Sequence, residues 1–156
     1  MPRFVSSRDF NLIQHFNREI LNDIVDVDVI LYKIALDTTS VNLYGEATEK
    51  ARYTGVELKS LVKYKKNIAD TASGFGVDIE QDVEFRFARN LLEEVNVYPE
   101  IGDIIHYDDS YYEIDNINDT QYVAGQPYNS LSILCDAHLT RISGLNIEEP
   151  GSNGWL

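Results

Sequence analysis

The chain has 156 residues, enough for one domain with a buried core, and its composition of 44% hydrophobic and 25% charged residues is that of a globular protein. No stretch approaches the ~18 apolar residues that a membrane span requires. The formal net charge of −13 argues against phosphate-driven binding of nucleic acid, which depends on lysine and arginine. The single cysteine, Cys135, excludes an intramolecular disulfide and suits a reducing compartment. The opening residues lack the apolar segment of a secretion signal, so we expect synthesis in the cytoplasm.

The first predicted element is an amphipathic helix over residues 6–24. Ser6 or Ser7 can cap it, and large apolar residues recur at helical spacing: Leu12, Ile13, Phe16, Ile20 and Ile24. This stripe can cover the sheet of its own domain or lie against a neighbouring subunit. We favour the neighbouring subunit, with Phe16 and Ile20 as candidate interface residues.

A β-domain is expected over residues 27–141. Val27–Leu36 is apolar on both faces and β-branched, which is typical of a buried strand. A short extended segment at Val41–Glu46 follows, and Arg52–Tyr64 alternates well enough to be another strand. Asn67–Gln81 is small, polar and contains glycine, so we predict a long exposed loop that serves as an intersubunit arm, a channel-gating element or a simple surface loop.

The second half of the chain continues with short strands. Val83–Leu92 begins with strand alternation and loses it near Ala88, which indicates a strand running into a turn or short helix. Residues 103–117 read as a β-hairpin whose reversal is Asp108-Asp109-Ser110. Gln121–Gly125 and Ser132–Arg141 are predicted strands, and a polar tail covers 143–156. The pattern predicts a single domain over 1–156 that is mainly β with an N-terminal helix (α+β), a small antiparallel β-barrel or sandwich with one amphipathic helix.

The negative charge is concentrated in this second half. Residues 90–140 contain no lysine or arginine and ten acidic side chains. Such a block can be a solvated face, a surface for a basic protein partner, or a wall that DNA passes without binding. The candidate lumen or docking residues are Asp103, Asp108, Asp109, Glu113 and Asp115. Three further candidate interface residues lie elsewhere, at Tyr44, Phe75 and Trp155.

Motifs for catalysis or metal binding are weak. Cys135 and His138 form C-x-x-H without the further ligands that zinc needs, and residues three apart on a strand point to opposite faces. Gly74-x-Gly76 lacks the rest of a dinucleotide-binding fingerprint. The histidines have no nucleophile motif beside them. We therefore expect no enzymatic activity, no metal and no cofactor.

Three segments carry a family resemblance. They are ILYKIALDTTSVNLYGEA (Ile30–Ala47), PEIGDIIHYDDSYYEIDNINDTQYVAG (Pro99–Gly125) and ILCDAHLTR (Ile133–Arg141). Together they resemble the neck proteins of T-even-type, contractile-tailed bacteriophages, and the GD-I-I…YYEIDNI portion is also similar to phage head-closure, or stopper, proteins. The N-terminal helix and the Asn67–Gln81 segment match no pattern of this family.

The resemblance implies a non-enzymatic virion protein at the head-to-tail junction, assembled in the host cytoplasm. Such proteins form a ring, commonly a homohexamer, between the portal-bound adaptor and the tail terminator. They complete the head, retain the packaged DNA and dock the tail. Double-stranded DNA would pass without specific binding, and no membrane is involved.

Two alternatives remain open. A tail-terminator or sheath-stabilising ring protein would share small β-domains and the lack of chemistry. From a different class, a small β-barrel binding module could use some of the ten tyrosines to recognise a sugar or peptide.

Overall fold

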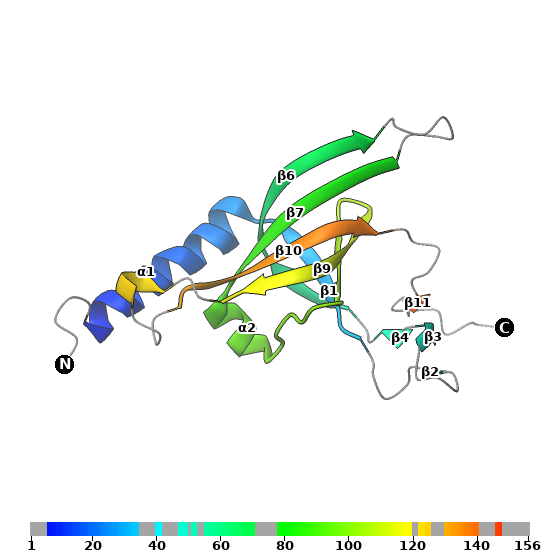
Figure 1. The fold of residues 1–156 in the computed structure, drawn as a ribbon. Helices are drawn as coiled ribbons and strands as arrows, with labels where there is room; N and C mark the ends of the chain where they lie inside the picture. Colours follow the sequence, from blue (N-terminus) through cyan, green and yellow to red (C-terminus); the bar gives the residue numbers. More distant parts are fainter. Residues whose placement is uncertain are drawn as a thin grey trace.

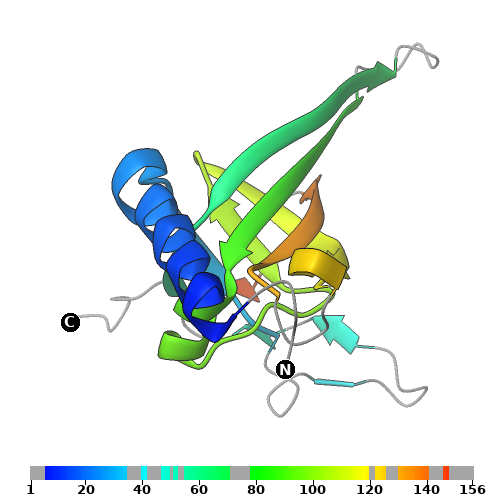
Figure 2. The same cartoon turned by 90° about the vertical axis from the view of Figure 1, so that its left-hand side faces the viewer.

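The computed structural model is built on one curved, seven-stranded antiparallel sheet with a helix, α1, along its outside (Figures 1 and 2). It describes residues 6–34, 40–41, 47–49, 51–52, 55–70, 78–119, 122–125, 130–140 and 146–147. The strands of the main sheet are β1 (Asp28–Tyr32), β5 (Val56–Lys59), β6 (Leu61–Asp70), β7 (Asp78–Ala88), β8 (Ile104–Tyr107), β9 (Ser110–Asn118) and β10 (Ser132–Thr140). Short strands lie outside it: β2 (Ser40–Val41) pairs with β3 (Ala47–Glu49), and β4 (Ala51–Arg52) with β11 (Asn146–Ile147). The predicted fold class is confirmed.

The N-terminal helix forms where the sequence predicts it. α1 spans Ser7–Glu19, and a π-helical turn, η1 (Ile20–Val25), continues it. Ser6 caps the helix, because its Oγ accepts a hydrogen bond from the backbone N–H of Asp9 (3.2 Å) while its own N–H donates to the Asp9 carboxylate (3.3 Å). Asp26 ends η1 in a left-handed conformation with φ 49°. Since this cap is local, the helix begins at the same residue whatever it packs against.

The sheet order, β5-β1-β8-β9-β10-β7-β6, places two consecutive strands at opposite edges. β5 and β6 are separated only by Ser60, which is fully buried. Its N–H donates to the Val27 carbonyl (3.0 Å) and its Oγ donates to the Arg86 carbonyl (3.2 Å). Ser60 therefore draws the two edges together, and the sheet curls into an open barrel. The prediction of one strand over Arg52–Tyr64 is wrong, because the chain turns this corner at Ser60.

The long loop predicted at Asn67–Gln81 is also wrong in its extent. β6 and β7 pair from Leu61 with Arg86 as far as Asp70 with Asp78, so both ends of the predicted loop belong to strands. β10 accompanies β7 only as far as the pair His138–Asp82. Beyond that point the two strands project from the sheet as a hairpin, which both ribbon views show (Figures 1 and 2). Polar composition suggested a loop, but backbone pairing between the two strands is satisfied without an apolar face.

The remaining elements largely follow the predictions. β7 runs directly into α2 (Arg89–Val95), as the loss of alternation near Ala88 indicated. The β8–β9 hairpin turns at the two predicted aspartates, and β10 forms at the predicted place. The predicted strand at Gln121–Gly125 is wrong for its described residues: Val123–Gly125 is a short 3₁₀ turn (η2), and Tyr122 makes a single bridge to Ser130. The polar tail over 143–156 is outside the described residues apart from β11.

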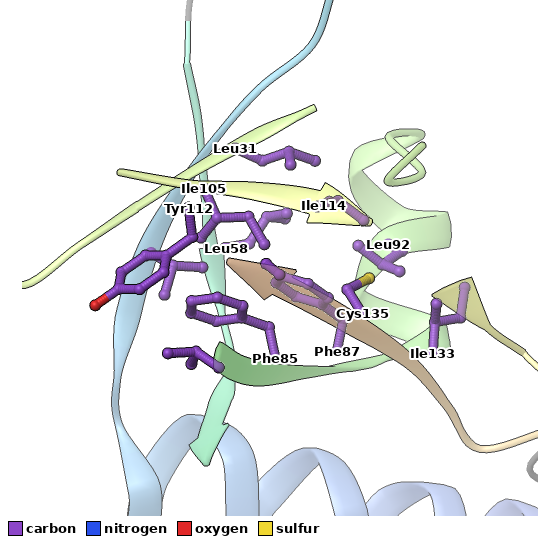
Figure 3. Close-up of a cluster of buried hydrophobic side chains, with 13 residues drawn as sticks. Leu31, Leu58, Phe85, Phe87, Leu92, Ile105, Tyr112, Ile114, Ile133 and Cys135 are labelled. Carbon is purple, nitrogen blue, oxygen red and sulfur yellow. The ribbon is translucent and has the colours of Figure 1, made fainter. Parts of the chain in front are cut away.

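The core lies inside the curl of the sheet (Figure 3). Alternate residues of β7 point inward, and Phe85 packs edge-on against Tyr112 of β9 with ring centroids 5.6 Å apart. Cys135 and Leu92 join the same cluster from β10 and α2. Gly55 stands where a Cβ would meet the Ile30 side chain at 2.3 Å, so only glycine fits beside β1. Packing of this kind holds the β8–β9 hairpin and α2 in fixed positions.

Candidate assembly surfaces

The turn between β8 and β9 exposes two carboxylates at the end of the hairpin. Asp108 and Asp109 have φ angles of 48° and 57°, and Tyr107 pairs with Ser110 across them. A two-residue turn with both φ values positive matches the twist of the flanking strands, and aspartate tolerates this conformation better than most residues. Both side chains are exposed. The turn geometry thus directs two negative charges away from the sheet.

A hollow of about 310 Å³ opens beside this turn. It is lined by residues of β1, β5, β8 and the turn: Asp28, Ile30, Glu57, His106, Tyr107, Asp108 and Asp109. Lys59 is 2.6 Å from Asp28 and also pairs with Asp26; hydrogen bonds to these two carboxylates raise the pKa of Lys59 above its usual value. For Glu57, Asp108 and Asp109 the described residues contain no Lys or Arg within salt-bridge distance. The hollow is suited to a cationic group.

Lysines and arginines from outside the acidic block neutralise half of it. Five of its ten acids lie within 4.0 Å of such a cation. The pairs are Arg89–Glu93, Arg18–Glu94, Lys33–Glu100, Lys33–Asp103 and Lys65–Asp136. The absence of lysine and arginine from residues 90–140 therefore does not leave the block uncompensated, because residues far away in sequence supply cations to half of its acids. Asp108 and Asp109 are two adjacent acids of the block for which the described residues supply no lysine or arginine within salt-bridge distance.

Asp103 does not belong to an exposed acidic surface, contrary to the prediction. Its side chain is 1% exposed and accepts hydrogen bonds from the backbone N–H groups of Glu100 (2.8 Å) and Ile34 (3.1 Å). Lys33 Nζ lies 3.7 Å away. Burial raises the pKa of this carboxyl, against the lowering effect of the two hydrogen bonds and of Lys33. The residue joins the turn before β8 to the end of β1, and Gly102, with φ +90°, completes that turn.

The two other predicted acids lie along β9 rather than at the turn. Glu113 and Asp115 alternate with the buried Tyr112 and Ile114, so they are on the outer face of the sheet. The Asp115 carboxylate is 2.8 Å from His138 Nδ1 on the neighbouring strand. His106 stacks on Tyr111 with ring centroids 4.6 Å apart. The structure therefore separates the predicted acidic set into a turn pair, a strand pair and a buried residue.

α1 presents its apolar side away from the domain. No residue of α1 is buried; its Phe16 is 53% exposed, and Ile20 at the start of η1 is 47% exposed. The side that faces the domain is mixed: it carries the half-buried Phe10, Gln14, Asn17 and Arg18, followed by the buried Leu21 of η1. Arg18 makes two contacts to the Glu94 carboxylate on α2, at 2.5 and 3.1 Å. Most of the large apolar side chains of this helix nevertheless remain exposed, which is unusual for a surface helix. Tyr44, Phe75 and Trp155, the other candidate interface residues, lie outside the described residues.

A second exposed apolar group follows α2, and the sequence analysis did not identify it. Val95, Tyr98 and Ile101 are 46%, 40% and 65% exposed. We call these three side chains the 95–101 patch. Val95 is the last residue of α2, while Tyr98 and Ile101 lie in the irregular segment after it, so no helical or strand pattern connects the three. The sequence signal for the patch is three large apolar residues in a segment that Pro99 and Gly102 mark as a turn.

Cys135 is inert in this fold. Its thiol faces the core, and burial raises its pKa to about 12. His138, three residues on, is on the outer face beside Asp115. The two side chains of the C-x-x-H motif therefore point to opposite faces, as predicted. Within the described part of the chain, no group of three or more His, Cys, Asp or Glu side chains is placed to hold a metal ion. No helix among the same residues is long and apolar enough to cross a membrane.

Comparisons with known proteins assign no family to this chain. No protein-family model matches the chain, and no curated protein sequence matches it. One solved structure that it resembles is a chain from the virion of a native gene transfer agent particle. The match has a TM-score of 0.44 and 11% identity over 72% of this chain and 93% of that one. Similarity at this level establishes neither a common family nor a common function.

Proposed function

We propose that this chain is a structural protein of the neck of a tailed-phage particle. In this role it forms a ring, a homohexamer in the simplest case, between the portal-bound adaptor and the tail terminator. The ring completes the head, retains the packaged DNA and docks the tail, and the chain has no enzymatic role. Its place is the virion, and double-stranded DNA passes through the ring without specific binding.

The observation that carries this proposal is where the three resembling segments lie in the fold. Ile30–Ala47 includes most of β1 and, outside the main sheet, β2; Pro99–Gly125 includes β8 and β9, and Ile133–Arg141 includes most of β10. These four main-sheet strands are consecutive, in the order β1-β8-β9-β10. Segments that are far apart in sequence thus form one continuous structural unit. A shared unit of this kind is what a family resemblance predicts, whereas chance similarities would be scattered over the fold.

The acidic turn is better suited to docking a protein than to lining a DNA channel. Ion pairs neutralise half of the acids in residues 90–140. These residues would therefore form a poor channel wall, because a wall that repels DNA along its whole length needs uniform negative charge. The remaining charges at Asp108 and Asp109 border a hollow large enough for a lysine or arginine side chain. We therefore propose that this turn meets a basic surface of a neighbouring ring, where complementary potentials steer the approach.

Cryo-electron microscopy of intact particles tests the assignment. A closed ring of this chain at the head-to-tail junction is the expected result. Purification of heads and free tails from an assembly-blocked infection separates the neck from the tail-terminator alternative, because a neck protein leaves with the heads. A particle whose junction lacks this chain would refute the proposal.

A double substitution, Asp108→Asn with Asp109→Asn, tests the docking role. Asparagine tolerates positive φ as aspartate does, so the turn is preserved while two charges are removed. We expect filled heads that bind tails poorly, together with normal retention of DNA. The matched control, Glu113→Gln with Asp115→Asn, removes two charges from β9 and should dock normally. Normal docking by the turn variant, with DNA release or passage altered, would support the channel reading instead.

A further inference from the structure

We infer that the outward apolar face of α1 and its continuation η1, which we call the α1 face (Leu12, Ile13, Phe16, Ile20 and Ile24), packs against the 95–101 patch of a second copy of this chain. The inference deepens the proposed ring, because it names the two surfaces that join neighbouring copies. A contact between two different surfaces is heterologous, and repetition of such a contact generates a ring when the rotation from one copy to the next closes.

The exposure of the apolar stripe is the first support. Its five outward apolar side chains are between 37% and 75% exposed. The side towards the domain is mixed, with Phe10 and Leu21 beside Gln14, Asn17 and Arg18. Contact with the domain therefore covers only Phe10 and Leu21 well and leaves the larger apolar stripe in solvent. An amphipathic helix is stabilised chiefly by burying its apolar stripe, which here requires another molecule.

The area of the two surfaces fits a specific contact. At roughly 190 Å² for a large apolar side chain, the exposed part of the α1 face is about 500 Å² and that of the 95–101 patch is about 300 Å². Apolar atoms make up about 60% of a typical interface, so the whole contact would bury about 1,300 Å². This is within the range of stable protein interfaces. A contact between two α1 faces would bury at least as much, and the single variants below separate the two arrangements.

Electrostatics explains why copies of a chain with a net charge of −13 can meet here. The three acids that border the 95–101 patch, Glu93, Glu94 and Glu100, are each in an ion pair. α1 itself carries two arginines and two acids, and one of these arginines, Arg18, is the partner of Glu94. The Asp108-Asp109 turn, by contrast, would repel its own copy. A second copy also covers both apolar surfaces with a single kind of contact, whereas an unrelated partner on α1 would leave the patch exposed.

The test combines two single variants, Phe16→Asp on α1 and Ile101→Asp on the patch. Sedimentation of the full-length chain from about 1 to 100 μM should show self-association for the unmodified chain, weakened at least about tenfold in each variant. An equimolar mixture of the two variants should form dimers and nothing larger. In that mixture, only the intact α1 of one variant and the intact patch of the other can pair. The controls Asn11→Asp and Tyr122→Asp place the same charge at other exposed positions and should associate normally.

Each result decides for or against the inference. Circular dichroism confirms folding, which should survive because neither substituted side chain is buried. A chain that stays monomeric throughout, or variants that associate like the unmodified chain, would overturn it. So would a mixture that fails to form dimers. Pairing of α1 with α1 would show itself differently, because Ile101→Asp alone would then associate like the unmodified chain. The proposed function fails separately, if the chain self-associates through these surfaces but is absent from the junction of the particle.

Discussion

Replacing the buried Asp103 should destabilise the fold strongly, unlike replacement of exposed acids such as Asp108 in the same acidic block. Asp103→Ala removes the acceptor of two backbone N–H groups, those of Glu100 and Ile34. Each buried donor left without a partner costs about 1–3 kcal/mol, and relief of the buried carboxylate's desolvation offsets part of this. We expect a net loss of about 3 kcal/mol in the free energy of unfolding.

Urea unfolding followed by circular dichroism measures this loss. With a slope near 2 kcal/mol/M, the midpoint should fall by about 1.5 M while the slope stays the same. Asp103→Asn retains one acceptor oxygen and should lose about half as much. The exposed Asp108→Asn is the matched control and should stay within about 0.5 kcal/mol of the unmodified chain. Equal midpoints for Asp103→Ala and this control would refute the structural role.

The dependence on pH gives an independent check. Burial raises the pKa of Asp103 in the folded state, so the native protein holds this proton to a higher pH than the unfolded chain does. The stability that this group contributes is present at low pH and is lost as pH rises from about 4 towards the native pKa. Asp103→Asn does not titrate at this position. The gap in stability between the unmodified chain and this variant should therefore shrink with rising pH. A widening gap would mean that the hydrogen bonds and Lys33 outweigh burial.

Three further predictions concern the core and the corner of the sheet. Phe85→Ala should cost about 3–5 kcal/mol, seen as a lower urea midpoint, because the ring is fully buried against Tyr112. Ser60→Ala should cost about 1–2 kcal/mol by the same assay, since the Arg86 carbonyl loses the hydroxyl donor of Ser60. An unchanged urea midpoint would show that this hydroxyl does not help to hold the β5 and β6 edges of the sheet together. Cys135 should react with a thiol reagent at pH 8 only as fast as the protein unfolds, because its native pKa is about 12.

Local patterns predicted those elements whose signals are complete within a few residues. The Ser6 cap and the apolar repeat define α1, and the aspartate pair defines the β8–β9 turn. The break at Ser60 has no such signal, because inward-facing residues continue at period two from Leu58 through Ser60 to Val62. What separates β5 from β6 is their pairing with different strands, and pairing between distant segments leaves no local trace.

The candidate surfaces show the same limit. The apolar stripe of α1 could be read from the sequence, but periodicity only states that one side is apolar and not where the domain lies. The net charge over residues 90–140 likewise counts ten acids and no lysine or arginine. The fold brings a lysine or arginine from elsewhere in the chain to five of these acids. Lys65 reaches Asp136 only because β6, β7 and β10 are neighbours in the sheet. Burial of Asp103 depends in the same way on contact with Ile34, far from it in sequence.

Stability and assembly are carried by different parts of this chain, and this separation follows from how α1 is held. The buried cluster comes from the strands and α2, while α1 contributes only half-buried side chains such as Phe10 and the Arg18–Glu94 pair. The outward apolar side chains bury little against the domain and an exposed ion pair is worth little, so this side of α1 adds little to the stability of the isolated domain. Its apolar face can then be selected for a partner without affecting the core. Substitutions on that face should change association and leave the urea midpoint unchanged, whereas core substitutions should do the reverse.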